Sequence, residues 1–112
     1  GVSAGAICWF KKGITDSWKD SQATIDCLGF VEGICCPHYD EEPERIPYVK
    51  KILEANEITE CYGIEGYAAL HLIDDKPRYN VSFKKDTSCH HIFLGNNKVH
   101  HKNIDGTIEV DL

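Results

Sequence analysis

Hydrophobic and polar residues alternate in blocks that predict two helices and several short strands. Apolar residues recur at helical spacing near the start and predict a helix over residues 3–12 that ends at Gly13. Residues 14–27 are mostly polar and predict a loop. The apolar run at residues 34–36 predicts a short buried strand, which Pro37 ends.

The pattern after Pro37 predicts a second helix and then a run of strands. Apolar residues on one face of residues 44–55, with two lysines near the end, predict the helix. The predicted strands are residues 58–62, 67–73 and 79–83, a hairpin of 92–94 and 98–99, and a strand or loose tail at 103–112. This order predicts an α/β fold with a mostly parallel sheet and an antiparallel hairpin extension.

Composition narrows the functional classes. The chain has 112 residues, enough for one small domain, and its 42% hydrophobic and 27% charged content is that of a soluble globular protein. A formal net charge of -6 argues against nucleic-acid binding, which needs a basic face. No apolar run reaches the roughly 20 residues of a membrane span. We therefore expect neither a nucleic acid nor a membrane as a partner.

The cysteines favour a reduced environment. Cys8, Cys27, Cys35 and Cys36 lie in apolar stretches, where a free cysteine behaves as a small buried hydrophobe. This predicts a cytoplasmic protein with free thiols, and a disulfide framework is the alternative.

The candidate chemistry begins at residues 1–5, Gly-Val-Ser-Ala-Gly, which have the Gly-x-Ser-x-Gly pattern of a nucleophile elbow. An elbow is a sharp strand-to-helix turn that exposes a serine, and its glycines are expected where a Cβ would collide with a neighbouring strand or helix. Serine is a weak nucleophile near neutral pH and needs a histidine base, which a carboxylate orients. His38 and Glu65 each follow a predicted strand, so we expect them to lie with Ser3 at one edge of the sheet.

Three segments carry a resemblance to a known family: Gly-Val-Ser-Ala-Gly-Ala at residues 1–6, Cys-Cys-Pro-His-Tyr-Asp at 35–40 and Tyr-Gly-Ile-Glu-Gly at 62–66. Together they resemble the dipeptidase E family of serine peptidases, family S51. The order serine, histidine, acid differs from the serine, acid, histidine order of α/β-hydrolases. The resemblance implies a fold similar to class I glutamine amidotransferases, a three-layer αβα sandwich. It also implies a serine peptidase that hydrolyses small peptides through an acyl-enzyme, with no cofactor or metal.

By this resemblance Ser3 is the nucleophile, His38 the general base and Glu65 the third member of the triad, with Asp40 as the alternative acid. The backbone N–H of Ala4 supplies one oxyanion donor, and the second comes from a glycine-rich loop in the family's N-terminal half. All 112 residues fit the family's C-terminal half. The chain has no methionine and begins at the elbow, so we expect residues 1–112 to be a single partial domain.

The segment after His38 bears on the substrate. Residues 40–44 are strongly acidic and Arg45 is the only nearby cation, so this rim is expected to repel an aspartyl substrate and to attract a free α-amino group. We therefore expect a short peptide with a neutral or basic first residue, bound near Asp40, Arg45 and Trp18. In an alternative interpretation, Trp18 caps the first helix.

Other functions stay open at this point. One is a half-domain without activity of its own, stable only as a homodimer or in association with the missing N-terminal half. Another is a non-peptidase amide hydrolase of the same fold. Cys89 with the pairs His90-His91 and His100-His101 is a candidate zinc cluster, although we expect these histidines to face solvent beside a hairpin.

Overall fold

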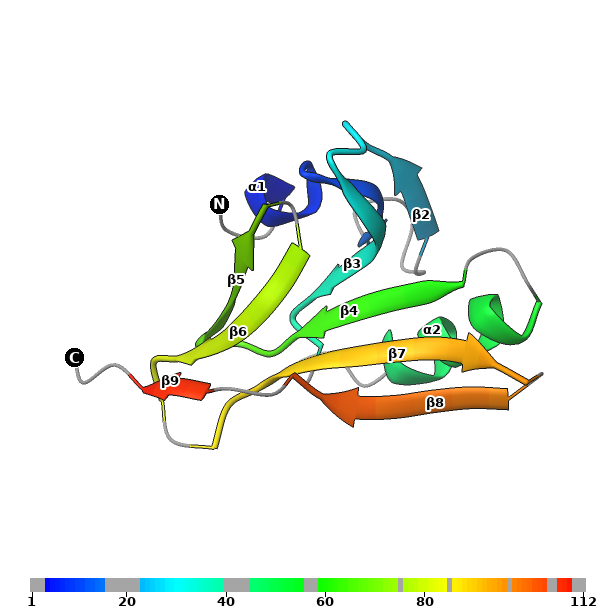
Figure 1. The fold of residues 1–112 in the computed structure, drawn as a ribbon. Coiled ribbons are helices and arrows are strands. Elements are labelled where there is room, and N and C mark those ends of the chain that lie inside the picture. Colours follow the sequence, from blue (N-terminus) through cyan, green and yellow to red (C-terminus); the bar gives the residue numbers. More distant parts are fainter. Residues whose placement is uncertain are drawn as a thin grey trace.

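The computed structural model describes residues 4–15, 23–39, 45–55, 59–74, 76–84, 86–96, 98–104 and 107–109. Within them lie two helices, α1 (Ala4–Ile7) and α2 (Arg45–Glu54), and nine strands (Figure 1). The strands are β1 (Phe10–Thr15), β2 (Ala23–Asp26), β3 (Val31–Pro37), β4 (Glu60–Ile64), β5 (Ala68–Ile73), β6 (Lys76–Ser82), β7 (Cys89–Gly95), β8 (Lys98–Asn103) and β9 (Thr107–Glu109). Neither of these helices is long and apolar enough to cross a membrane.

The strands form two sheets. The larger has six strands in the order β2-β1-β3-β4-β7-β8, and the smaller has three in the order β5-β6-β9. In the larger sheet β1, β3 and β4 run parallel, while β2 on one side and the hairpin β7–β8 on the other pair antiparallel. The predicted α/β class and the antiparallel hairpin extension are confirmed.

Helix α2 covers one face of the larger sheet (Figure 1). Its apolar residues Val49, Ile52 and Leu53 fall on one side of the helix and are at most 3% exposed. They share a core cluster with side chains of β1, β3, β4 and β7, which are Ile14, Ile34, Cys36, Cys61 and Ile92. Alternation along β3 places Ile34 and Cys36 on this face and the intervening cysteine on the other.

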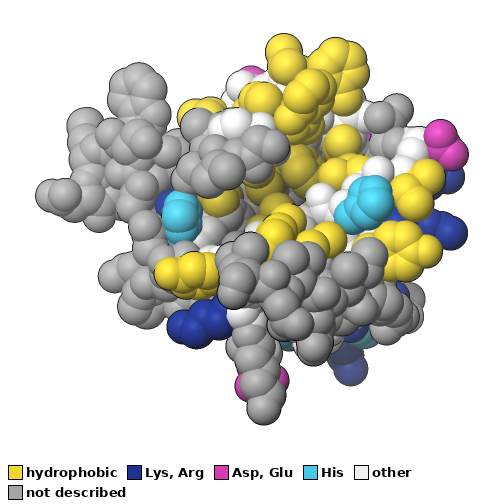
Figure 2. Space-filling model, turned by 90° about the vertical axis from the view of Figure 1, so that its left-hand side faces the viewer, with side chains coloured by type: hydrophobic (Ala, Val, Ile, Leu, Met, Phe, Trp, Pro, Cys, Tyr) yellow, Lys and Arg dark blue, Asp and Glu magenta, His cyan; other side chains and the backbone are white. Residues whose placement is uncertain are grey.

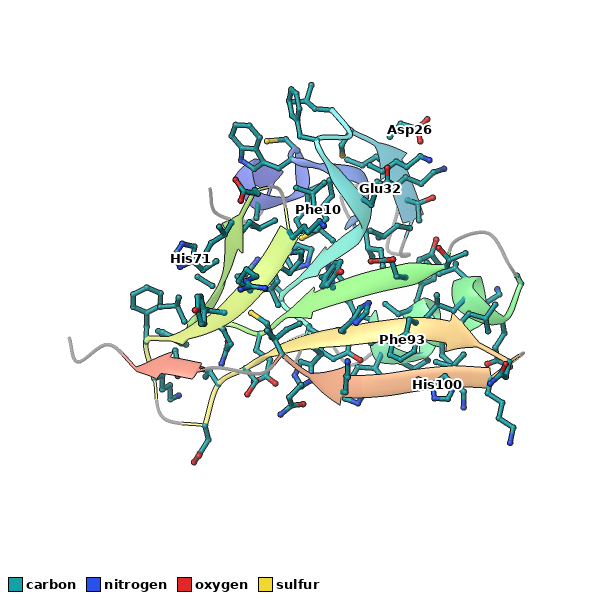
Figure 3. The ribbon with its side chains drawn as sticks, viewed as in Figure 1. Phe10, Asp26, Glu32, His71, Phe93 and His100 are labelled. Carbon is teal, nitrogen blue, oxygen red and sulfur yellow. The ribbon has the colours of Figure 1, made fainter. Side chains whose placement is uncertain are left out.

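The opposite face of the larger sheet packs against α1 and β5. The residues of this second cluster are Ile7, Phe10 (Figure 3), Val31, Cys35 and Tyr62, with Leu70 and Leu72 of β5 packed against them. A Cβ on Gly13 would lie 1.9 Å from Ile7 Cγ2, so glycine at this position lets α1 approach β1 closely. Among the described residues this face carries one short helix and a sheet, so the three-layer αβα sandwich stays a prediction.

The helix predicted over residues 3–12 is wrong beyond Ile7. The structure ends α1 there, and Phe10–Thr15 form β1, which pairs with β3 on one side and β2 on the other. Periodicity over so short a run does not separate a helix from a strand. Pairing on both sides satisfies the backbone of β1 and favours the extended form, which aromatic residues also prefer.

The loop predicted over residues 14–27 is wrong at both ends, because β1 runs into it and β2 lies within it. An ion pair of 3.2 Å between Lys12 and Asp26 joins these two strands. Residues 16–22 lie outside the described residues. The helix over 44–55 and the later strands are confirmed with shifted bounds, and the segment 103–112 contains β9, which pairs parallel with β6.

The six cysteines are free thiols in the structure. Cys35, Cys36, Cys61 and Cys89 have no exposed surface. Burial raises the pKa of the Cys89 thiol to about 12, with a smaller contribution from the nearby carboxylate of Glu65. Burial also raises the pKa of the Cys35 and Cys61 thiols, so these three thiols stay protonated and unreactive near neutral pH.

Candidate functional site

Strand pairing brings His38 and Glu65 to the same edge of the larger sheet. The strands β3 and β4 run parallel, and Pro37 and Ile64 are the last residues that pair between them. His38 and Glu65 are the next residues of the two strands. Because neighbouring strands lie about 4.8 Å apart, the two residues leave the sheet side by side.

The turn at residues 37–39 holds His38 in an uncommon backbone conformation. His38 has a φ of 53°, in the left-handed region that few non-glycine residues adopt. The next residue, Tyr39, donates its N–H to the carbonyl of Ile64 at 3.0 Å, and its side chain is 6% exposed. Its ring lies against Gly63, where a Cβ would come within 2.6 Å of the ring. The hydrogen bond and the ring packing of Tyr39 fix the turn and so maintain the strained backbone of His38. Strained backbone conformations of this kind are concentrated at functional sites.

A cavity of about 550 Å³ lies where α1, β5 and the ends of β3 and β4 meet. Ionisable side chains of the lining come from His38, Glu65 and Tyr67. The remaining lining is Ala6, Trp9, Phe10, Pro37, Ile64, Gly66, Ala68, Ala69, Leu70, Leu72 and Phe83. Figure 2 shows hydrophobic side chains gathered on the side of the molecule that carries α1 and β5. His38 and Glu65 therefore lie in apolar surroundings, where electrostatic interactions are stronger than in water.

Glu65 is held in place by hydrogen bonds of both its backbone and its carboxylate. Its N–H donates to the carbonyl of Ser88 at 3.2 Å, and its own carbonyl accepts from the N–H of Ala68 at 3.1 Å. Its carboxylate oxygen Oε2 is hydrogen-bonded to Nε2 of His90. His90 Nδ1 is hydrogen-bonded in turn to Nε2 of His101 at 2.9 Å. The carboxylate that the sequence predicted as the third triad member therefore ends a chain of two imidazoles.

The contact between Glu65 and His90 was not predicted from the sequence. The sequence predicted that the paired histidines face solvent, which is wrong for His90 because this residue is only 8% exposed. Neighbouring residues on a strand point to opposite faces, so each histidine pair places one ring on the face that holds α2. That alternation was the available signal, and the register of β7 and β8 decides which rings meet.

The other histidine of each pair belongs to a row of stacked rings on the opposite face. His91 stacks on Tyr62 with ring centroids 4.8 Å apart, and also on Phe93. Phe93 and His100 stack across β7 and β8 at 5.1 Å (Figure 3). Burial lowers the pKa of His91.

The described part of the chain contains no group of three or more His, Cys, Asp or Glu side chains arranged to hold a metal ion.

Arg45 serves the fold, which differs from the substrate contact that the sequence predicted. It is 2% exposed, and its Nη1 donates to the carbonyls of Ile14 at 3.2 Å and Pro37 at 3.0 Å. These bonds tie the beginning of α2 to the ends of β1 and β3. Arg45 therefore supports the turn that carries His38 from the side opposite the cavity lining.

Several predicted site residues cannot be placed. Ser3, Trp18 and Asp40 lie outside the described residues, and Ala4 is described only by its backbone, as the first residue of α1. Gly5 departs from the expected steric role, since a Cβ there would meet no atom of the described structure within 4 Å. Among the described residues of α1, Ala6 lines the cavity.

Comparisons with known proteins place these residues in a family context. The model of peptidase family S51 matches residues 1–79. An uncharacterized peptidase of Bacillus subtilis (strain 168), YgaJ, is 34% identical to the chain over 99 residues, which are 88% of this chain and 43% of the relative. The chain therefore spans less than half the length of this relative. No solved structure matches the chain significantly.

Proposed function

Because the chain belongs to peptidase family S51, we propose that it carries the catalytic residues of a serine-type peptidase similar to dipeptidase E. One observation supports this proposal above all. The last paired residues of β3 and β4 are followed directly by His38 and Glu65, and both residues line one cavity with Ala6 of α1. Ala6 comes three residues after Ser3 in the sequence. A histidine and a carboxylate thus line one apolar cavity together with a residue of the helix that directly follows the serine motif.

In the proposed mechanism Ser3 attacks the carbonyl carbon of the scissile peptide bond. His38 accepts the hydroxyl proton as the bond forms and then gives it to the leaving amine. Glu65 orients the imidazole of His38 and stabilises its positive charge. The N–H of Ala4 donates to the oxyanion, and a water molecule, activated by His38, then hydrolyses the acyl-enzyme.

The proposed substrate is a short peptide with a free N-terminus and a neutral or basic first residue. The cavity volume of about 550 Å³ is in the range of small-molecule sites, and its apolar lining favours an uncharged side chain. The acidic residues 40–44, which lie outside the described residues, are proposed to attract the α-amino group. An aspartyl side chain gains nothing from either feature.

Labelling with a fluorophosphonate tests the mechanism, because this reagent reacts with an activated serine. We expect covalent labelling at Ser3, none in Ser3→Ala, and a loss of about 10²–10⁴-fold in labelling rate in His38→Gln. His71→Gln is the matched control, since His71 is an exposed histidine of β5 outside the cavity lining. Labelling of another residue, or equal rates in His38→Gln and His71→Gln, would contradict the proposal.

A panel of dipeptides and simple amides then tests the substrate. We expect hydrolysis of dipeptides with a neutral or basic first residue, and a strong preference for N-terminal aspartate would refute the proposed specificity. Hydrolysis of amides without hydrolysis of any dipeptide would favour the amide hydrolase. The assays are run on the chain and on any longer product of its gene, so that activity requiring further segments is detected.

A further inference from the structure

We propose that His90 is a positioning residue for Glu65, and that His101 holds the ring of His90 through a second hydrogen bond. The inference rests on the proposed function, in which Glu65 orients His38. It assigns a role to two histidines that the proposed mechanism does not use. The argument comes from strand register, burial and hydrogen-bond chemistry.

Strand register brings the three side chains together. His90 pairs with Gly63 of β4, two residues before Glu65, so His90 lies beside the end of β4. On β8 the residue His101 pairs with Ile92, which has the same side-chain direction as His90. His90 and His101 are therefore diagonal neighbours on one face of the β7–β8 hairpin. The result is an unbroken chain of hydrogen bonds from Glu65 through His90 to His101 on the outer strand β8.

Burial makes this contact hold the carboxylate firmly. The side chain of Glu65 is 16% exposed and that of His90 is 11% exposed, so little water competes for the bond between them. The ring of Tyr39 lies against His90 with centroids 5.0 Å apart, and the missing Cβ of Gly63 makes room for it. His90 is not among the residues that line the cavity. It therefore contacts Glu65 from outside the space that a substrate would occupy.

Hydrogen-bond chemistry determines which nitrogens carry protons. An ionised carboxylate only accepts hydrogen bonds, so Nε2 of His90 must donate to Glu65. A neutral His90 with its proton on Nε2 accepts at Nδ1 the hydrogen bond that Nε2 of His101 donates. The N–H of His101 then points to His90, and the N–H of His90 points to Glu65. Burial lowers the pKa of His101, with a further contribution from His90, and this favours the neutral ring.

The consequence for the proposed reaction is geometric. His90 is hydrogen-bonded to Oε2 of Glu65, so in the proposed mechanism the other oxygen, Oε1, is the one that contacts the imidazole of His38. A carboxylate held at one oxygen presents the other in a defined orientation. Loss of His90 is therefore expected to lower kcat with little change in KM, since the bound peptide does not contact this histidine.

The kinetic test compares substitutions at two neighbouring positions of β7. We expect His90→Leu to lower kcat and the rate of fluorophosphonate labelling about 10²-fold. His90→Gln keeps an N–H donor at the position of Nε2 and is expected to recover most of that loss. His91→Leu is the matched control, because His91 points to the opposite face and stacks on Tyr62. Equal rates in His90→Leu and His91→Leu, with Ser3 still labelled, would overturn the positioning role and leave the proposed function standing.

A second measurement does not depend on activity. Nitrogen NMR of 15N-histidine-labelled protein reports which ring nitrogen carries the proton. We expect Nε2–H at His90, with a shifted Nε2 signal in Glu65→Gln and an unchanged signal in Glu32→Gln, an exposed position on β3. A His90 signal insensitive to Glu65→Gln would overturn the inference even if the wild-type chain did not label. If the wild-type chain did not react with the fluorophosphonate but gave the expected NMR result, the outcome would count against the proposed function alone.

Discussion

Substitution of Gly63 by alanine tests the packing that holds the turn at residues 37–39. The added Cβ would lie 2.6 Å from Cδ1 and 2.7 Å from Cγ of Tyr39, well inside van der Waals contact. The ring has little freedom to move, because it is 6% exposed and lies against His90. Overpacking of a buried site costs about 1–3 kcal/mol, and we expect Gly63→Ala to lower the free energy of unfolding by about 2 kcal/mol.

Urea unfolding followed by circular dichroism measures this loss. With a slope of about 1–3 kcal/mol per molar urea, a loss of 2 kcal/mol lowers the midpoint by about 1 M while the slope is unchanged. The matched control is Gly5→Ala. Its Cβ would meet no described atom within 4 Å, and alanine is favoured over glycine in a helix by about 1 kcal/mol. We expect this control to be neutral or slightly stabilising.

A double-mutant cycle identifies the clash as the cause. In a Tyr39→Leu background the ring is gone, so the added methyl group at Gly63 should cost much less. The coupling energy between the two substitutions is expected to be about 1–2 kcal/mol. The same cost of Gly63→Ala with and without the Tyr39 ring would refute the reasoning. A loss below about 0.5 kcal/mol in the single variant would refute it as well.

Two further predictions concern stability. Arg45→Met leaves two buried backbone carbonyls without the guanidinium donor and should lower the free energy of unfolding by about 2–4 kcal/mol in the same urea assay, whereas Arg78→Met, at an exposed position of β6, should change it little. Burial lowers the pKa of His91 and His101 below 6.5, so the unfolded chain takes up protons first as the pH falls. The stability that these two histidines contribute should therefore be complete above about pH 6.5 and decline as the pH falls below it. His91→Gln should flatten that decline in the free energy of unfolding. A steeper acid decline in this variant would contradict the assignment.

The sequence alone was sufficient for the parts of the site that depend on local pattern. An apolar run stopped by Pro37 placed His38 after a strand, and the pattern before Gly63 placed Glu65 after the next one. Two strands joined through a helix predict parallel pairing, so the sequence alone predicted that His38 and Glu65 lie at the same edge of the sheet. The motif at residues 1–5 and the segment around His38 also indicated the peptidase family, to which the family match assigns the chain.

Contacts between distant segments decided the rest. Residues 10–15 form a strand because β3 and β2 lie on either side of them, and no local pattern records those neighbours. Arg45 turns inward because the carbonyls at the ends of β1 and β3 meet beneath it. The bond from Glu65 to His90 needs the register of β4 against β7, which a shift of one residue would reverse by sending His90 to the other face. The sequence therefore determined which chemical groups reach the edge of the sheet, and the tertiary structure decided which of them touch.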